Sequence, residues 1–221
     1  MSDVNEILDS IKTNNIEALL RYINDDPLRA ESTTDQGISL IQFAAYCRNN
    51  EAISILQSYK KEIDLFDAVS IGERETVSHI ISRDRMQVNS FSKDGFTPLG
   101  LASFFENVAV VLLLLANGAD PNLIAKNDFK VAPLHSACAI FNYEIAALLI
   151  KGGGDVNAKQ MQGVTPLHSA AHNGKTDLAK LLLDHGALVN APMDNGQTPL
   201  FMAEEKGFYE TADLIKKYGG K

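Results

Sequence analysis

The chain has 221 residues, of which 45% are hydrophobic, a composition typical of a folded globular protein. Its formal net charge of -8 would repel the phosphates of a nucleic acid and the headgroups of an anionic membrane, so neither is expected as a partner. The longest apolar run, residues 108–116, is far shorter than the roughly 20 residues of a membrane helix, and the acidic first residues do not have the layout of a signal peptide.

In the first part of the chain, apolar residues recur at helical spacing over residues 7–23, 37–45 and 65–81. The first and third of these stretches are each long enough for two short helices. From residue 95 onward the pattern becomes a repeat. Segments beginning GFTPLGLAS, KVAPLHSAC, GVTPLHSAA and GQTPLFMAE start at residues 95, 130, 163 and 196, and each is followed by a second apolar run. This period of 33 to 35 residues predicts stacked units that share a continuous core.

The residue types in the repeat suit the ends of helices. Thr165 stands where a side-chain oxygen can accept a hydrogen bond from the first turn, and Pro166 stands at the first helical position, where no N–H is needed. Gly186 can adopt the positive φ that ends a helix. Each unit therefore reads as two helices joined by turns.

These residues resemble the ankyrin repeat family. The resemblance is carried by the TPLH box (165–168) and its APLH counterpart (132–135), the pair Ala170 and Ala171, the turn glycines Gly118 and Gly186, and the closing Asn122, Asn157 and Asn190. It covers about the last 130 residues strongly, whereas the first part matches on frame alone, with Ser39 and Leu40 in place of Thr and Pro. It implies an all-α solenoid of about seven stacked helix–turn–helix units with β-hairpin fingers.

We expect one domain over residues 1–221. Its units fall roughly at 1–34, 35–62, 63–92, 93–126, 127–159, 160–192 and 193–221, with the first and last as caps. In the last unit Thr211 and Lys216 replace the apolar Leu178 and Leu183, as an exposed end face requires. Between the second and third units, residues 58–63 are too few for the usual hairpin.

His168 and His172 lie four residues apart with Ser169 between them, a spacing that could serve a metal site or a serine nucleophile. In the family, however, the histidine of the box bonds between repeats, which accounts for His135 and His168. The zinc-protease pattern also needs a Glu where Ser169 stands. We therefore expect no enzymatic activity, no catalytic residue, no metal and no cofactor.

Three alternatives stay open. One is a ligand- or metal-binding protein that uses the groove histidines His135, His168 and His172. Another is an unrecognised enzyme. The last, implied by the resemblance, is a substrate of an asparaginyl hydroxylase through Asn157 and Asn190.

The resemblance implies that a protein partner docks on the concave side of the stack, on the positions after the alanine pair and at the finger tips. These positions are apolar in the first five units and polar in the last two. The candidate partner-binding residues are Tyr46, Ile71, Phe96, Phe104, Phe105, Phe129, Ile140 and His172. The alternative is that the aromatic residues pack against one another as core.

Charge and cysteine content suggest where the chain works and with what. The net negative charge favours a partner with a basic patch, by speeding encounter. Cys47 and Cys138 are the only cysteines, and two distant thiols suggest reduced residues and a cytoplasmic location.

Overall fold

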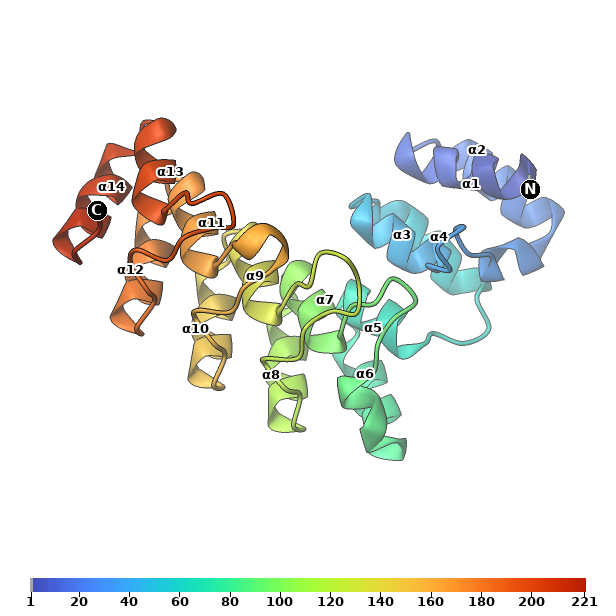
Figure 1. Ribbon diagram of the computed structural model, residues 1–221. Helices are drawn as coiled ribbons and strands as arrows, with labels where there is room; N and C mark the ends of the chain where they lie inside the picture. Colours follow the sequence, from blue (N-terminus) through green and yellow to red (C-terminus); the bar gives the residue numbers. More distant parts are fainter. Residues whose placement is uncertain (1) are drawn as a thin grey trace.

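The structure is a computed structural model that describes residues 2–221 (Figure 1). Within these residues seven helix pairs follow one another in a curved row, so the predicted all-α repeat architecture is confirmed. The pairs are α1 (Ser2–Lys12) with α2 (Ile16–Asp25), α3 (Leu40–Tyr46) with α4 (Asn50–Tyr59), α5 (Leu65–Ile71) with α6 (Arg74–Arg83), α7 (Pro98–Phe104) with α8 (Val108–Ala116), α9 (Pro133–Ala139) with α10 (Tyr143–Lys151), α11 (Pro166–His172) with α12 (Thr176–Asp184), and α13 (Pro199–Glu205) with α14 (Tyr209–Lys217). Short 3-10 helices cover Pro27–Glu31, Arg85–Asn89 and Met161–Gly163.

In several units the first helix begins at a side chain that caps it. The cap predicted at Thr165 is not among them, because its hydroxyl makes no capping hydrogen bond and lies 2.8 Å from Nδ1 of His168. The hydroxyl of Thr97 accepts a hydrogen bond from the N–H of Gly100 at 3.0 Å, and Pro98 follows at the first helical position. The divergent unit near the N-terminus uses the same device, because Ser39 accepts from the N–H of Gln42 at 3.0 Å. The helix therefore starts correctly there without the TP dipeptide.

Two histidines of the box connect neighbouring units, as predicted. The Nδ1 atom of His168 accepts a hydrogen bond from the N–H of Thr165 at 3.1 Å, which leaves Nε2 to donate to the carbonyl of Gln197 in the next unit at 3.3 Å. His135 repeats this arrangement, with its Nε2 at 3.2 Å from the carbonyl of Val164. Burial lowers the pKa of His135 to about 4, so this side chain is neutral at neutral pH.

The fingers between units are hairpin loops closed by backbone hydrogen bonds, and neighbouring tips are also joined through the backbone. Regular β structure within residues 2–221 is limited to an isolated bridge between Thr33 and Ser39. The bonds that join one tip to the next run from the N–H of Lys126 to Gly95 O (2.8 Å), of Met161 to Phe129 O (3.0 Å) and of Asp194 to Gln162 O (3.0 Å). The tips of the last four fingers therefore form one continuous edge.

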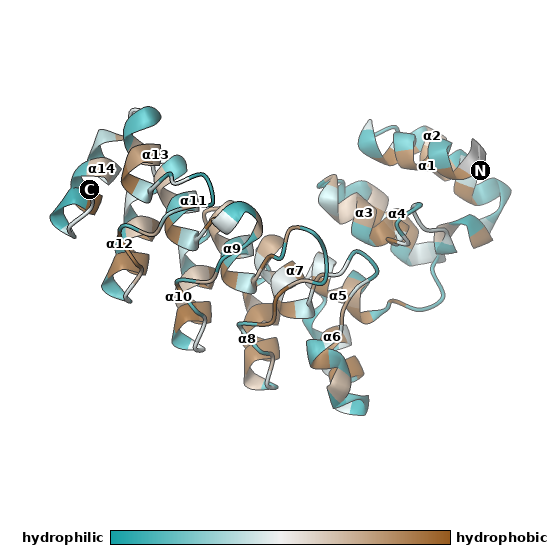
Figure 2. Cartoon of the chain, viewed as in Figure 1, coloured by the Kyte–Doolittle hydropathy of each residue, from teal (hydrophilic) through white to brown (hydrophobic). Residues whose placement is uncertain are grey.

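The buried apolar residues form two clusters. The larger extends through α5–α14, from Leu65 to Ile215, and the smaller through α1–α4, from Ile7 to Leu56. Figure 1 shows α1–α4 set apart from the row of later pairs, and Figure 2 shows apolar residues concentrated along α8. The boundary falls where α4 ends at Tyr59 and α5 begins at Leu65, the connection predicted to be too short for a finger.

A buried polar network holds this short connection. The ammonium group of Lys60 forms an ion pair with the carboxylate of Asp67, and the hydroxyl of Ser39 donates to the same carboxylate. Both charged side chains are withdrawn from solvent, with Lys60 9% and Asp67 1% exposed. Farther along, the amide of Gln57 on α4 donates to Glu73 at the start of α6. These bonds join the two clusters where a finger would otherwise do so.

The last unit is only partly the polar cap that its sequence predicts. Lys216 is exposed and forms an ion pair with Glu204 at 2.7 Å, as expected of an end face. The prediction for Thr211 was wrong, because its side chain is buried and shares a hydrogen bond of 2.8 Å with the hydroxyl of Thr176. Thr211 faces α12 of the preceding unit, and its partner there satisfies the hydroxyl.

Candidate protein-binding surface

Three aromatic side chains from two units meet on one side of the stack. The ring of Tyr46 lies 5.9 Å from that of Phe104 and 5.0 Å from that of Phe105, and the two phenylalanines stand edge to face at 5.3 Å. The hydroxyl of Tyr46 also donates to Asp94 at 3.0 Å. Tyr46 belongs to the unit of α3 and its partners to the unit of α7. The side chain therefore reaches past the intervening unit, which has the small Ser70 at the equivalent position.

The three rings differ in exposure, which divides their roles. Phe104 is 38% exposed, whereas Tyr46 and Phe105 are half-buried and pack against the larger apolar cluster. Burial, and secondly the nearby Asp94 carboxylate, raises the pKa of Tyr46. The alternative prediction, that the aromatic residues pack against one another, therefore describes Tyr46 and Phe105. Phe104 keeps part of its ring exposed to solvent.

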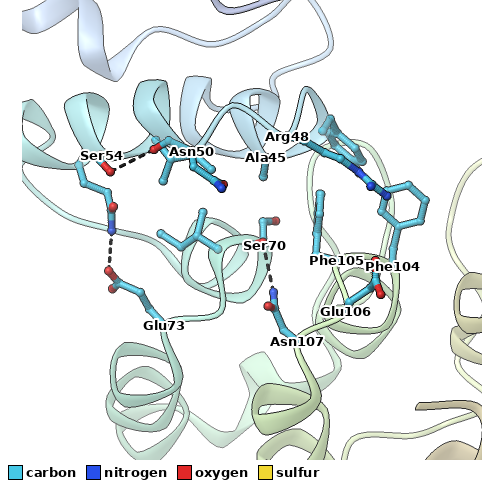
Figure 3. Close-up of a pocket in the computed structure, with 14 residues that line it drawn as sticks. Ala45, Arg48, Asn50, Ser54, Ser70, Glu73, Phe104, Phe105, Glu106 and Asn107 are labelled. Carbon is cyan, nitrogen blue, oxygen red and sulfur yellow. Dashed lines mark hydrogen bonds between the residues drawn. The ribbon is translucent and has the colours of Figure 1, made fainter. Parts of the chain in front are cut away.

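Beneath this cluster lies a cavity of about 530 Å³ between the α3–α4 pair and the two units that follow (Figure 3). Ile71 lines it, and the side chain of Arg48 extends toward Phe104 at one end. Within residues 2–221 the hydroxyl oxygen of Ser70, which is shielded from solvent, has no hydrogen-bond partner. The cavity is a consequence of the short connection, because the second and third units meet without a finger between them.

The other predicted residues lie at different depths. Phe129, at the tip of its finger, is 56% exposed, and His172 on α11 is exposed as well. Ile71, Phe96 and Ile140 are half-buried. The candidate residues therefore do not form one uniform patch, and Phe104, Phe129 and His172 are the most accessible of those named here.

Phe141 is one of several exposed aromatic residues that were not predicted. Phe141 is 38% exposed and has a φ of 62°, and the ammonium group of Lys175 lies 4.3 Å from its ring centroid. It occupies the turn between the two helices of its unit, where Gly174 and Gly207 stand in later units. A bulky residue at a position that favours glycine was the signal that could have identified it.

The histidines and cysteines considered as candidates for chemistry do not form a common site. Both ring nitrogens of His168 have hydrogen-bond partners, and His168 is buried while His172 is exposed, so the two do not form a paired site. Cys47 and Cys138 are not bridged. Across residues 2–221 no group of three or more His, Cys, Asp or Glu side chains is arranged to hold a metal ion. Nor does that part of the chain contain a helix with the length and apolarity to span a membrane.

Comparison with known proteins agrees with this geometry. The ankyrin repeat description matches residues 94–127, and the description of ankyrin repeats in three copies matches residues 134–221. The chain belongs to the ankyrin repeat family. The match begins in the unit of α7, so the divergent units near the N-terminus are assigned by their helix pairs alone.

This ankyrin repeat chain is similar to parts of proteins of different kinds. It is 36% identical over 73 residues to alpha-latrocrustotoxin-Lt1a of Latrodectus tredecimguttatus, which covers 33% of the chain and 5% of the toxin. It is 38% identical over 69 residues to palmitoyltransferase akr1 of Schizosaccharomyces pombe, covering 31% and 11% of the two proteins. With the ankyrin repeat and SAM domain-containing protein 6 of Rattus norvegicus it is 31% identical over 110 residues, covering 47% and 12%. The chain thus spans a small part of each relative, and what they share with it is the repeat.

The opposite surface of this ankyrin repeat stack, formed by the second helices, includes exposed apolar residues. Leu112 on α8 is 49% exposed, while Val110, Val111 and Leu114 of the same helix are buried. A single exposed leucine is ordinary on a soluble surface. It therefore provides a control position away from the groove.

Proposed function

We propose that this ankyrin repeat protein is a non-enzymatic interaction module that docks a partner protein on the concave side of its stack. Ankyrin repeats generally serve as protein–protein interaction modules. The observation that carries the proposal here is the exposure of apolar side chains on that side, above all Phe104 at 38%. Exposed aromatic residues supported by a packed surround are typical of interface anchors.

The rigid surround of Phe104 supports this role. Phe105 packs edge to face against it, and Tyr46 fixes the pair through its own ring and through Asp94. A partner would therefore meet a side chain that loses little freedom on binding, which favours affinity. We assign contact to Phe104, Phe129 and His172, and support to Tyr46 and Phe105.

Charge and thiol state enter the proposal as well. The net charge of -8 favours a partner that is basic at long range, although charges near the contact can differ locally. The buried thiol of Cys138 and the unbridged Cys47 support the cytoplasmic location expected from the sequence. The proposed mechanism is non-covalent docking, without a chemical step.

The test compares the proteins captured by the wild-type chain with those captured by three variants, each with one substitution. Phe104→Asp and His172→Asp place a carboxylate on the concave side, and Leu112→Asp places one on the opposite surface. We expect the groove variants to lose the proteins captured by the wild type, and Leu112→Asp to retain them. Circular dichroism establishes that each variant is folded. If Leu112→Asp loses the captured proteins, or if both groove variants keep them, the proposal is wrong.

A further inference from the structure

Two neighbouring fingers, residues 123–131 and 158–164, form a surface unlike the others. Their tips are joined by the hydrogen bond of 3.0 Å between the N–H of Met161 and the carbonyl of Phe129. Phe129 is 56% and Met161 43% exposed, so two exposed apolar residues lie on neighbouring fingertips that are joined through the backbone. Three exposed lysines lie on the same two fingers. We call the five residues Lys126, Phe129, Lys130, Lys159 and Met161 the fingertip patch.

The charge of this patch is opposite to that of the whole chain. The two fingers contain three lysines and a single carboxylate, that of Asp128, whereas the net charge of the chain is -8. None of the three lysines forms an ion pair with a carboxylate of residues 2–221. Lys126 instead lies over the ring of Phe91, with its ammonium group 4.1 Å from the centroid. Within the described residues the three ammonium groups therefore lack a carboxylate partner, and only that of Lys126 contacts a ring.

Backbone conformation provides a second, independent observation. Lys130 has a φ of 52° at the position where three other fingers have Gly95, Gly163 and Gly196, with φ of 83°, 73° and 84°. This left-handed conformation is unfavourable for a residue with a Cβ atom. A lysine is thus present where glycine would fold more easily, a conflict that is typical of positions whose side chain has a use.

Phe129 shows the same conflict beside it. In the last finger the corresponding residue is Asn195, whose side chain accepts a hydrogen bond of 3.0 Å from the N–H of Gln197 and so stabilises the turn. A phenylalanine cannot do this, and its ring gains little burial in exchange. Two adjacent positions, Phe129 and Lys130, therefore have residues that do not suit the turn. In their place they offer an exposed ring and an ammonium group, which a partner can bind.

We propose that the fingertip patch binds an acidic segment of the partner that has an apolar side chain at its centre. The apolar side chain would pack on Phe129 and Met161, and flanking carboxylates would pair with Lys126, Lys130 and Lys159. Such charges act locally, because screening limits each to about 8–10 Å at physiological salt. The inference rests on the proposed function, since it names the chemistry of a partner that docks on this stack.

A nucleic acid is the competing anionic partner, and the observations favour a peptide. Three lysines neutralise few phosphates, and the remaining charge of the chain would repel a long polyanion. The paired apolar side chains also match a peptide side chain better than a phosphate backbone. Binding of a single-stranded oligonucleotide in preference to an acidic peptide is therefore an outcome that would overturn the proposal.

The test uses three pools of fluorescein-labelled short peptides with a central Leu or Phe. Their flanking positions are mixtures of Asp, Glu and Ser, of Lys, Arg and Ser, or of Ser and Gly. Fluorescence anisotropy measures the binding of each pool, and of a labelled oligothymidine, to the wild-type chain. We expect the acidic pool to bind at least about tenfold more tightly than the basic and neutral pools, and its binding to weaken as salt is raised.

Variants locate the site. Lys126→Glu/Lys159→Glu should weaken binding of the acidic pool at least about tenfold. The matched control Lys151→Glu/Lys217→Glu makes the same change in net charge at exposed lysines of second helices and should leave it within about twofold. Lys130→Gly should weaken binding while raising the melting temperature, a combination that a purely structural role would not produce.

The outcomes separate this inference from the proposed function. If no pool binds, if the basic or neutral pool binds as well as the acidic one, or if both charge-reversed variants weaken binding equally, the fingertip patch is not an acidic-peptide site. If Phe104→Asp abolishes partner capture but Lys126→Glu/Lys159→Glu does not, the groove function holds and this inference fails. The inference is supported if Lys126→Glu/Lys159→Glu abolishes acidic-pool binding and also weakens partner capture, even where Phe104→Asp leaves partner capture intact.

Discussion

Replacement of Tyr46 by alanine should uncouple the first two helix pairs from the remaining five. Tyr46 is the side chain that joins α3 to the unit of α7 across the short connection, through ring contacts with Phe104 and Phe105 and through the hydroxyl bond to Asp94. In a solenoid the stability of each unit depends on its contacts with neighbours. Loss of one such contact therefore acts at a single boundary.

The magnitude follows from the contacts that are lost. Two aromatic pairs contribute about 0.5–1.5 kcal/mol each beyond their burial. Removal of the half-buried ring forfeits about 1–2 kcal/mol of apolar burial. Together with the hydroxyl bond, Tyr46→Ala should destabilise the contact between α1–α4 and the rest by about 3–6 kcal/mol. Tyr46→Phe removes only the hydroxyl and should cost about 1 kcal/mol.

Hydrogen exchange measured by mass spectrometry provides the assay. In Tyr46→Ala, amides of residues 2–59 should exchange faster while those of residues 133–184 keep their wild-type protection. Urea unfolding followed by circular dichroism should separate into two transitions. A single transition with an unchanged midpoint, or faster exchange spread evenly over all units, would refute the assignment of Tyr46 as the connecting side chain.

Three further predictions concern single sites. His135 has a folded pKa of about 4 against 6.5 when unfolded, so its neutral form contributes about 3 kcal/mol that is present above pH 6.5 and is lost as the pH falls to 4. His135→Gln should therefore flatten the pH dependence of the unfolding free energy over that window, and a slope equal to that of the exposed-site control His79→Gln would contradict this. Lys130→Gly should raise the unfolding free energy by about 0.5–1 kcal/mol, because glycine tolerates a φ of 52°; a lower urea midpoint would show that the backbone there is unstrained. Lys60→Met should lower the unfolding free energy by about 3–5 kcal/mol, because it leaves the buried Asp67 carboxylate without its ammonium partner. Unchanged stability of Lys60→Met would mean that the carboxylate is already neutral.

Much of the architecture was readable from short-range patterns. The box residues act within one turn, so Thr97 and Ser39 could be assigned as helix caps without knowledge of their neighbours. The resemblance to ankyrin repeats implied that His135 and His168 bond to the next unit, and their hydrogen bonds confirm this. The repeat period did not predict which way a side chain on a second helix points, as the burial of Thr211 shows.

The depth of the candidate site was less predictable. Phe104 and Phe105 are adjacent in the sequence and both are aromatic, yet the first is exposed and the second half-buried. Both rings contact Tyr46, which comes from a unit that is not next to theirs in the stack. A pattern read one unit at a time has no information about such a contact. The positive φ of Lys130 and Phe141, by contrast, could have been suspected from their alignment with glycines.

The missing finger explains both the contact and the cavity. Without a hairpin between the second and third units, Gly37 in the finger of the second unit lies against Lys93 in the finger of the fourth. Closure on this side lets Tyr46 reach Asp94 and the two phenylalanines. The α3–α4 pair does not close equally against the next units on the side of the short connection, because the polar network of Lys60, Asp67 and Ser39 fixes that connection. A gap of about 530 Å³ is left between the pairs, and one shortened loop thereby shapes the concave surface on which the proposed partner would dock.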